Sequence, residues 1–190
     1  MATATKVSPE EYLRLERKAE FRSEYVDGMI VAMPGATRNH NIINKNVSGL
    51  FWLQLRGKSC EVYQSDMKVR TNKRYSYPDT VVVCDEPEFS DDEKDVLQNP
   101  TVLVEVLSRS TESYDRGDKF AAYRELKSLQ AYVLVSQLMP RVEAFKRQEN
   151  DWLFSEVSGI EKALKLEAIG CELKLSEIYE KVDFGREEES

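Results

Sequence analysis

The chain has 190 residues, of which 41% are hydrophobic, and a formal net charge of −7. This length and apolar content are typical of a single domain with its own hydrophobic core. The acidic balance argues against a protein that coats nucleic acid through bulk charge, but it leaves local contacts open. No apolar stretch is long enough to span a membrane. The three scattered cysteines, Cys60, Cys84 and Cys171, predict free thiols in a reducing cytoplasm.

The N-terminal part of the chain predicts two helices with a β-hairpin between them. Residues 8–19 begin with Ser-Pro-Glu-Glu, which combines an N-cap, a first-turn proline and a capping box. Asp27-Gly28 predicts a tight turn between strands at 22–26 and 29–33. A stripe of apolar residues at helical spacing predicts the second helix at 37–56.

The remainder predicts the strands of one mixed α/β domain that occupies residues 1–190. Strands are expected at 60–63, 67–71, 77–84, 102–107, 131–136, 141–146 and 152–157, and helices at 115–126 and from Ser176. The acidic segment 86–100 predicts a surface loop. The charged residues 186–190 predict a solvated, disordered tail.

Two carboxylates interrupt the most apolar of these segments. Asp79 lies in YPDTVVVC and Glu105 in VLVEVL, and both segments are typical of central strands. A carboxylate is costly to bury unless a cation neutralises it. The pair therefore predicts a shared cation, most simply a divalent metal. Taken singly, Asp79 fits a strand-end residue that accepts a backbone hydrogen bond, and Glu105 fits a buried partner of an arginine.

The helix expected after Glu105 carries a third feature. Asp115, Lys119 and Tyr123 follow one another at four-residue spacing, so they share one helix face. In one interpretation Lys119 stands beside the carboxylates, holds an attacking water and offsets charge on a phosphate. In the other it forms a surface pair with Asp115. The sequence pattern by itself favours the surface pair.

These residues recur with others in a recognisable order. The set is Glu24-Tyr25-Val26-Asp27-Gly28, Gly35-Ala36, His40, Pro78-Asp79, Glu105-Val106-Leu107-Ser108, Ser110-Thr111, Asp115, Lys119 and Tyr123. In this order the chain resembles the Uma-two family of restriction-endonuclease-like proteins, part of the PD-(D/E)XK nuclease superfamily. The resemblance covers roughly residues 8–147.

The resemblance implies a mixed α+β fold, a restriction-endonuclease-like core with a central mixed sheet flanked by helices. It implies a site for Mg²⁺, with Mn²⁺ as a substitute, formed by Asp79, Glu105 and the backbone carbonyl of Val106. Glu24 would serve a second metal or a water held by the metal. The implied catalytic residues are Asp79, Glu105, Lys119 and Glu24, and Asp115 and Tyr123 would support Lys119.

The chain also departs from the superfamily pattern. The superfamily lysine stands two residues after the second acid, and here that position is Leu107. Lys119 fits a lysine that has moved to the following helix, and catalysis depends on whether it reaches the site. Ser23 and Arg109 replace residues that are often aromatic and proline in relatives, away from the expected chemistry.

Substrate contacts are less sharply marked. His40 is the one histidine in the sequence. A local hydrogen bond at a helix start is its simpler interpretation, and the resemblance implies a contact with the substrate. The densest basic patch comprises Lys68, Arg70, Lys73 and Arg74. It fits either a solvated hairpin or a surface that contacts phosphates.

We therefore expect a metal-dependent endonuclease that hydrolyses nucleic-acid phosphodiester bonds, with DNA as the substrate. Cutting both strands of a duplex needs two sites, so we expect a homodimer, with strand edges after residue 131 as candidate surfaces. One alternative is a catalytically inactive nuclease-fold protein that binds nucleic acid or a protein partner. Another is a hydrolase of small phosphorylated substrates.

Overall fold

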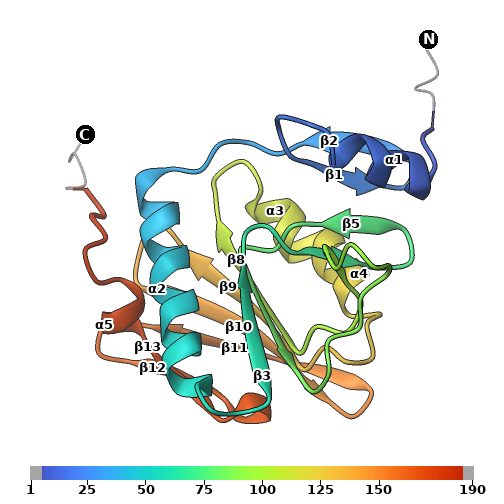
Figure 1. Cartoon of the computed structure of the whole chain (residues 1–190). Coiled ribbons are helices and arrows are strands. Elements are labelled where there is room, and N and C mark those ends of the chain that lie inside the picture. The colour runs from blue at the N-terminus through green and yellow to red at the C-terminus, as the bar shows by residue number, and fades with distance from the viewer. Residues whose placement is uncertain (1–5, 186–190) are drawn as a thin grey trace.

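The computed structural model describes residues 6–185, so the expected tail at 186–190 lies outside the described residues. At its centre is a six-stranded mixed sheet with the order β11-β10-β9-β8-β6-β3 (Figure 1). Its strands are β3 (Cys60–Gln64), β6 (Thr80–Cys84), β8 (Val102–Leu107), β9 (Ala131–Ser136), β10 (Arg141–Gln148) and β11 (Asp151–Ser158). Strands β8 and β9 are parallel, and the other neighbours are antiparallel. The expected mixed α+β class with a central mixed sheet is confirmed.

One face of this sheet is covered by the long helix α2 (Arg38–Leu55) and by elements from the C-terminus (Figure 1). These are β12 (Ala163–Leu166), a 3-10 turn (Glu167–Ile169), β13 (Cys171–Lys174) and α5 (Leu175–Ile178). The apolar stripe of α2, including Val47 and Phe51, packs against Val104 and Val106 of β8. Thr37 caps α2 by accepting a hydrogen bond from the backbone N–H of His40 at 3.1 Å. That cap places His40 in the first turn, at the sheet edge.

The opposite face carries a helical segment over residues 112–123. It consists of α3 (Glu112–Tyr114), a π-helical turn (Asp115–Lys119) and α4 (Phe120–Tyr123). Phe120 and Tyr123 pack against Leu103 and Leu107 of β8. Successive strand residues point to opposite faces. Glu105 therefore points to the helical segment, together with Leu103 and Leu107.

A second sheet lies beside this face in the order β2-β1-β5-β4-β7. Its strands are β1 (Ser23–Val26), β2 (Met29–Ala32), β4 (Lys68–Arg70), β5 (Arg74–Ser76) and β7 (Val96–Leu97). Helix α1 (Pro9–Glu16) closes it through Tyr12, whose ring centroid lies 5.3 Å from that of Tyr25 and 5.5 Å from that of Tyr75. This layer brings β1, and with it Glu24, next to the helical segment.

The structure differs from the sequence-based expectations at several elements. The helix expected at 115–126 begins at Glu112, ends at Tyr123 and contains the π-helical turn. The expected loop at 86–100 contains β7, and β5, β12 and β13 were not expected. Asp79 stands immediately before β6 instead of inside it. These short or irregular elements depend on distant partners, so local sequence pattern signals them weakly.

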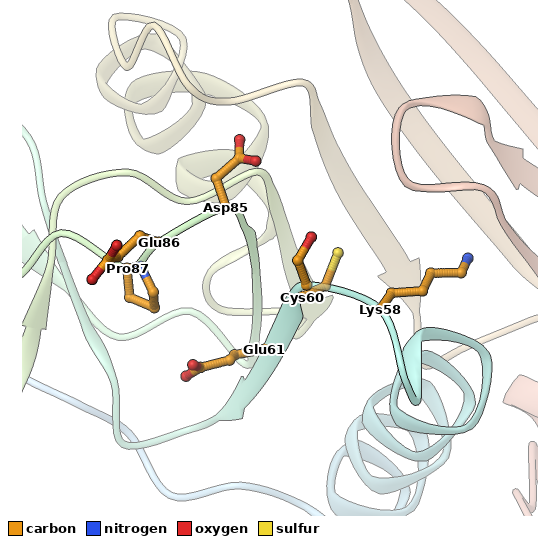
Figure 2. Close-up of a pocket in the computed structure, with 7 residues that line it drawn as sticks. Lys58, Cys60, Glu61, Asp85, Glu86 and Pro87 are labelled. Atoms are coloured by element: carbon orange, nitrogen blue, oxygen red, sulfur yellow. The ribbon is translucent and has the colours of Figure 1, made fainter.

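The expectation of three free thiols is wrong for two of the cysteines. Cys60 and Cys84 occupy directly paired positions of β3 and β6 and form a disulfide, whereas Cys171 is free and buried. A surface hollow of about 450 Å³ lies beside Cys60. Lys58 and Asp85, labelled in Figure 2, are among the residues that line it. This hollow lies at the C-terminal end of β6. Asp79 precedes the N-terminal end of the same strand, so the hollow is away from the cleft described below. Among residues 6–185, no helix has the length and apolar character needed to cross a membrane.

Candidate active site

A cleft of about 1580 Å³ gathers the acidic residues singled out in the sequence. Its walls come from the β1–β2 hairpin, the start of α2, the C-terminal end of β8 and the helical segment 112–123. The cleft is lined by Glu24, His40, Asp79, Glu105, Asp115 and Lys119, among others. Residues far apart in the sequence thus face one space.

Lys119 lies buried at the inner end of this cleft, with 6% of the residue exposed. Its Nζ is 2.8 Å from Oε1 of Glu105, 3.5 Å from Oε1 of Glu24 and 3.6 Å from Oδ1 of Asp115. The π-helical turn Asp115–Lys119 contains both the lysine and one of these acids. The lysine is therefore part of the acidic cluster, and the interpretation of Asp115 and Lys119 as a surface pair is wrong.

Glu105 is held from two sides at one oxygen. Its Oε1 receives the Lys119 contact and a 3.3 Å hydrogen bond donated by the hydroxyl of Tyr123. Burial raises the pKa of the Glu105 carboxyl well above its usual range, and the nearby Asp115 and Asp79 act in the same direction, while Lys119 opposes them. Burial also raises the pKa of Asp115.

The charges of the cluster are not balanced. Burial acts to lower the pKa of Lys119, but the carboxylates around it, chiefly Glu105, outweigh burial and hold that pKa well above its usual value. Lys119 consequently remains protonated. Of the carboxylates that line the cleft, those of Glu24, Glu105 and Asp115 all lie within 4 Å of this one lysine. The excess of negative charge and of oxygen donors suits a divalent cation.

Asp79 is fixed by contacts on both carboxylate oxygens. Oδ1 lies 2.7 Å from Nε2 of His40, and Oδ2 accepts a 2.7 Å hydrogen bond from the backbone N–H of Val106. In an extended strand the N–H and C=O of one residue point to the same side. The Val106 carbonyl therefore lies on the side of β8 that faces Asp79.

Gln137, immediately after β9, is a site residue that sequence reasoning missed. Its Nε2 donates to the Leu107 carbonyl at 2.8 Å and lies 3.5 Å from Nδ1 of His40, and its Oε1 accepts from the Thr37 hydroxyl at 2.6 Å. Gln137 thereby joins the end of β8 to the first turn of α2 and holds the His40 ring. A lone glutamine after a strand carries no sequence signal for this position.

Glu24 reaches the site from β1. Its Oε1 accepts a 3.1 Å hydrogen bond from the backbone N–H of Tyr77 and faces Lys119, which stands between Glu24 and Glu105. In the part of the chain that the structure describes, no three Asp, Glu, His or Cys side chains are close enough together to hold one ion. Glu24, Asp79 and Glu105 therefore do not converge on one ion. Oxygen donors of the kind that Mg²⁺ prefers are present in the cleft on the carboxylates of Asp79 and Glu105 and on the backbone of Val106.

The predicted basic patch does not line the cleft. Lys68 is buried, and its Nζ forms an ion pair with Asp95 at 2.8 Å. Arg74 donates a 2.9 Å hydrogen bond to the hydroxyl of Tyr114. Arg70 and Lys73 are exposed on the second sheet. Instead, four arginines that sequence reasoning had not grouped line the cleft, namely Arg22, Arg38, Arg109 and Arg141.

The mixed sheet, its flanking helices and the acidic cleft define a restriction-endonuclease-like α+β protein. The chain belongs to the Uma2 family, whose model, described as "Putative restriction endonuclease", matches residues 9–176.

Similar proteins extend over nearly the whole chain. Two relatives from Synechocystis sp., both described as uncharacterized, are slr1290, 37% identical over 94% of each chain, and sll1609, 35% identical over 84% of this chain and 92% of the relative. A crystal structure from Anabaena variabilis, described as "a putative nuclease belonging to DUF820", has a TM-score of 0.73. It is 15% identical and covers 91% of this chain and 97% of its own, which supports the fold.

Proposed function

We propose that this protein is a metal-dependent endonuclease that hydrolyses phosphodiester bonds in nucleic acid, with DNA as its substrate. The observation that carries the proposal is the buried Lys119, 2.8 Å from Glu105, in a cleft that Asp79 also lines. A lysine in this place can take the part of the superfamily lysine, whose usual position is Leu107. The family description and the nuclease-like structural neighbour support the same activity.

Asp79, Glu105 and the Val106 carbonyl would hold Mg²⁺ or Mn²⁺, and Glu24, on the other side of Lys119, would serve a second ion. Bound there, the ion would supply positive charge to the reacting phosphate and make water more acidic. The chain's own residues hold both of these carboxylates in place. His40 and the Val106 N–H hold the two oxygens of Asp79, while Tyr123 and Lys119 hold Glu105.

Lys119 would act as a donor, because its raised pKa keeps the ammonium protonated. It would orient the attacking water and offset charge that builds on the phosphate in the transition state. Asp115 and Glu24 restrain the ammonium at 3.6 and 3.5 Å, so its position does not depend on substrate. His40, at the cleft surface of Asp79, would also contact the substrate.

A matched pair of variants tests the activity. Purified protein is incubated with supercoiled plasmid, single-stranded DNA or RNA, with Mg²⁺ or Mn²⁺, alongside Asp79→Asn and the control Asp118→Asn. Asp118 is exposed on the same helical segment and does not line the cleft. We expect Asp79→Asn to abolish cleavage and Asp118→Asn to retain it. Cleavage that survives Asp79→Asn would refute the assigned role.

Metal binding has a separate readout in thermal unfolding. A ligand that binds the folded state at a hundred times its Kd stabilises it by about 2.7 kcal/mol. Mg²⁺ should therefore raise the melting temperature of the wild type and of Asp118→Asn, but not of Asp79→Asn. If calorimetry detects no Mg²⁺ or Mn²⁺ binding to the wild type, the alternative of a nuclease fold that binds without cutting takes its place.

We further propose that the protein forms a homodimer, because two-fold pairs are the commonest assemblies of soluble chains. The edge strand β11 is a candidate surface, since Leu153 and Phe154 on it are 49% and 51% exposed.

A further inference from the structure

The cleft is acidic at its inner end and carries both signs of charge around that end. The inner end holds the carboxylates around Lys119, whereas four arginines from separate segments line the rest of the cleft, its rim, together with Glu20, Glu112 and Asp183. A polyanionic substrate is repelled by the inner carboxylates and by the net charge of −7. Binding such a substrate therefore requires a local cationic surface next to the site.

Two of the rim arginines are free to supply that surface. Arg22 bonds to the Ser65 carbonyl and pairs with Asp66, and Arg141 lies 3.7 Å from Glu143. The side chains of Arg38 and Arg109 are exposed, and neither forms a hydrogen bond or ion pair with any other residue in 6–185.

Arg38 and Arg109 are both close in sequence to residues of the proposed active site. Arg38 opens α2 two residues before His40, which contacts Asp79. Arg109 follows the end of the β8 strand that carries Glu105. Arg38 and Arg109 reach the cleft from two different elements, so a nucleic-acid strand that runs through the cleft would contact both arginines. A guanidinium group binds a phosphate through two parallel hydrogen bonds. Arg38 and Arg109 are therefore suited to bind two phosphates of the same nucleic-acid backbone.

An apolar wall completes the rim. Phe21 is 84% exposed, lines the cleft and has no aromatic neighbour among the described residues. Val31 of β2 is 45% exposed and lines the same wall. An exposed phenyl ring that lines a cleft offers a stacking surface for a base. In a duplex the base faces are already stacked on each other, so this ring can be used fully only by an unpaired base.

We propose that the rim of the cleft binds a single-stranded polynucleotide, with Arg38 and Arg109 on backbone phosphates and Phe21 stacked on an unpaired base. The site thus favours single-stranded nucleic acid, or a locally opened strand, over an intact duplex. This inference rests on the proposed nuclease function, and it identifies the form of the substrate and the residues that select it.

Binding is measured apart from cleavage, by fluorescence anisotropy of a labelled oligonucleotide in EDTA, as a single strand and as the matching duplex. We expect the single strand to bind more tightly. Phe21→Ala should weaken its binding roughly 5- to 100-fold, while Phe21→Trp retains it and duplex binding changes little. Arg38→Ala with Arg109→Ala should weaken binding and reduce the slope of log affinity against log salt by about 1.4, the value for two phosphate contacts to a single strand.

The charge-matched control is Arg124→Ala with Lys127→Ala, two exposed residues outside the cleft, which should bind like the wild type. Equal or tighter binding of the duplex, or a Phe21→Ala variant that binds like the wild type, would overturn the proposal. If the rim variants lose binding but no protein cleaves any substrate, the rim site stands and the nuclease function fails. If cleavage depends on Asp79 while the rim variants bind and cleave normally, the function stands and the rim site fails.

Discussion

Removing the charge of Lys119 while keeping its stem tests whether this lysine serves the reaction or only the fold. Lys119→Met retains most of the aliphatic length, so the loss of packing is small. The loss of charge leaves Glu105, which is 4% exposed, beside Glu24 and Asp115 with no nearby ammonium. Breaking a buried ion pair from one side costs about 3–5 kcal/mol.

This cost is a large part of the roughly 5–15 kcal/mol that stabilises a typical domain. For a chain of this size it corresponds to a fall in melting temperature of roughly 6–20 °C. Cleavage per folded molecule should fall roughly 10²-fold or more, because a positioned donor to the transition state is lost. Mg²⁺ should stabilise Lys119→Met more than the wild type, since the ion replaces part of the missing positive charge.

The assay combines urea unfolding with plasmid nicking, and corrects each rate for the folded fraction. Lys127→Met, an exposed lysine just beyond the helical segment, is the control and should leave both properties unchanged. A Lys119→Met protein with the wild-type rate per folded molecule would remove Lys119 from the mechanism. Wild-type stability in that variant would refute the buried ion-pair network itself.

Three further predictions concern acid stability, the disulfide and assembly. Asp95 accepts hydrogen bonds from Arg17 and Lys68, and these partners lower its pKa from 3.8 to about 2. The ionised Asp95 stabilises the folded state by about 1 kcal/mol after allowance for solvent exposure. This contribution is present above pH 3.8 and is lost as the pH falls through 2. The stability of Asp95→Asn should therefore fall less steeply with acid over that range. Oxidised protein, once unfolded, should yield a single reactive thiol, and three reactive thiols would show that Cys60 and Cys84 are not bonded. Cys60→Ser should be less stable than the oxidised wild type by about 3 kcal/mol, but not less stable than the reduced wild type. Light scattering at micromolar concentration should give the mass of a dimer, and a monomeric mass would contradict the proposed assembly.

The features of this protein that depend on local pattern could be predicted from its sequence. The continuous apolar segments predicted β6 and β8 and placed Glu105 within the second of these strands. The four-residue spacing of Asp115, Lys119 and Tyr123 placed all three on one side of a helix. Residue order also carried the resemblance to the family. These features are local because strand and helix periodicity are properties of a short stretch of chain.

Which distant residues meet depends on how the sheets and helices pack together. Burial of Lys119 requires β1 to bring Glu24 against the helical segment, and the sequence pattern by itself favoured a surface pair. The sequence grouped Lys68 with residues that could contact a substrate, but in the fold Lys68 forms an ion pair with Asp95. Conversely, nothing in the sequence groups Arg38 with Arg109, but the packing of α2 and β8 brings both residues to one cleft. Such contacts arise from the order of strands in the sheets and the packing of layers upon them, which no single segment encodes.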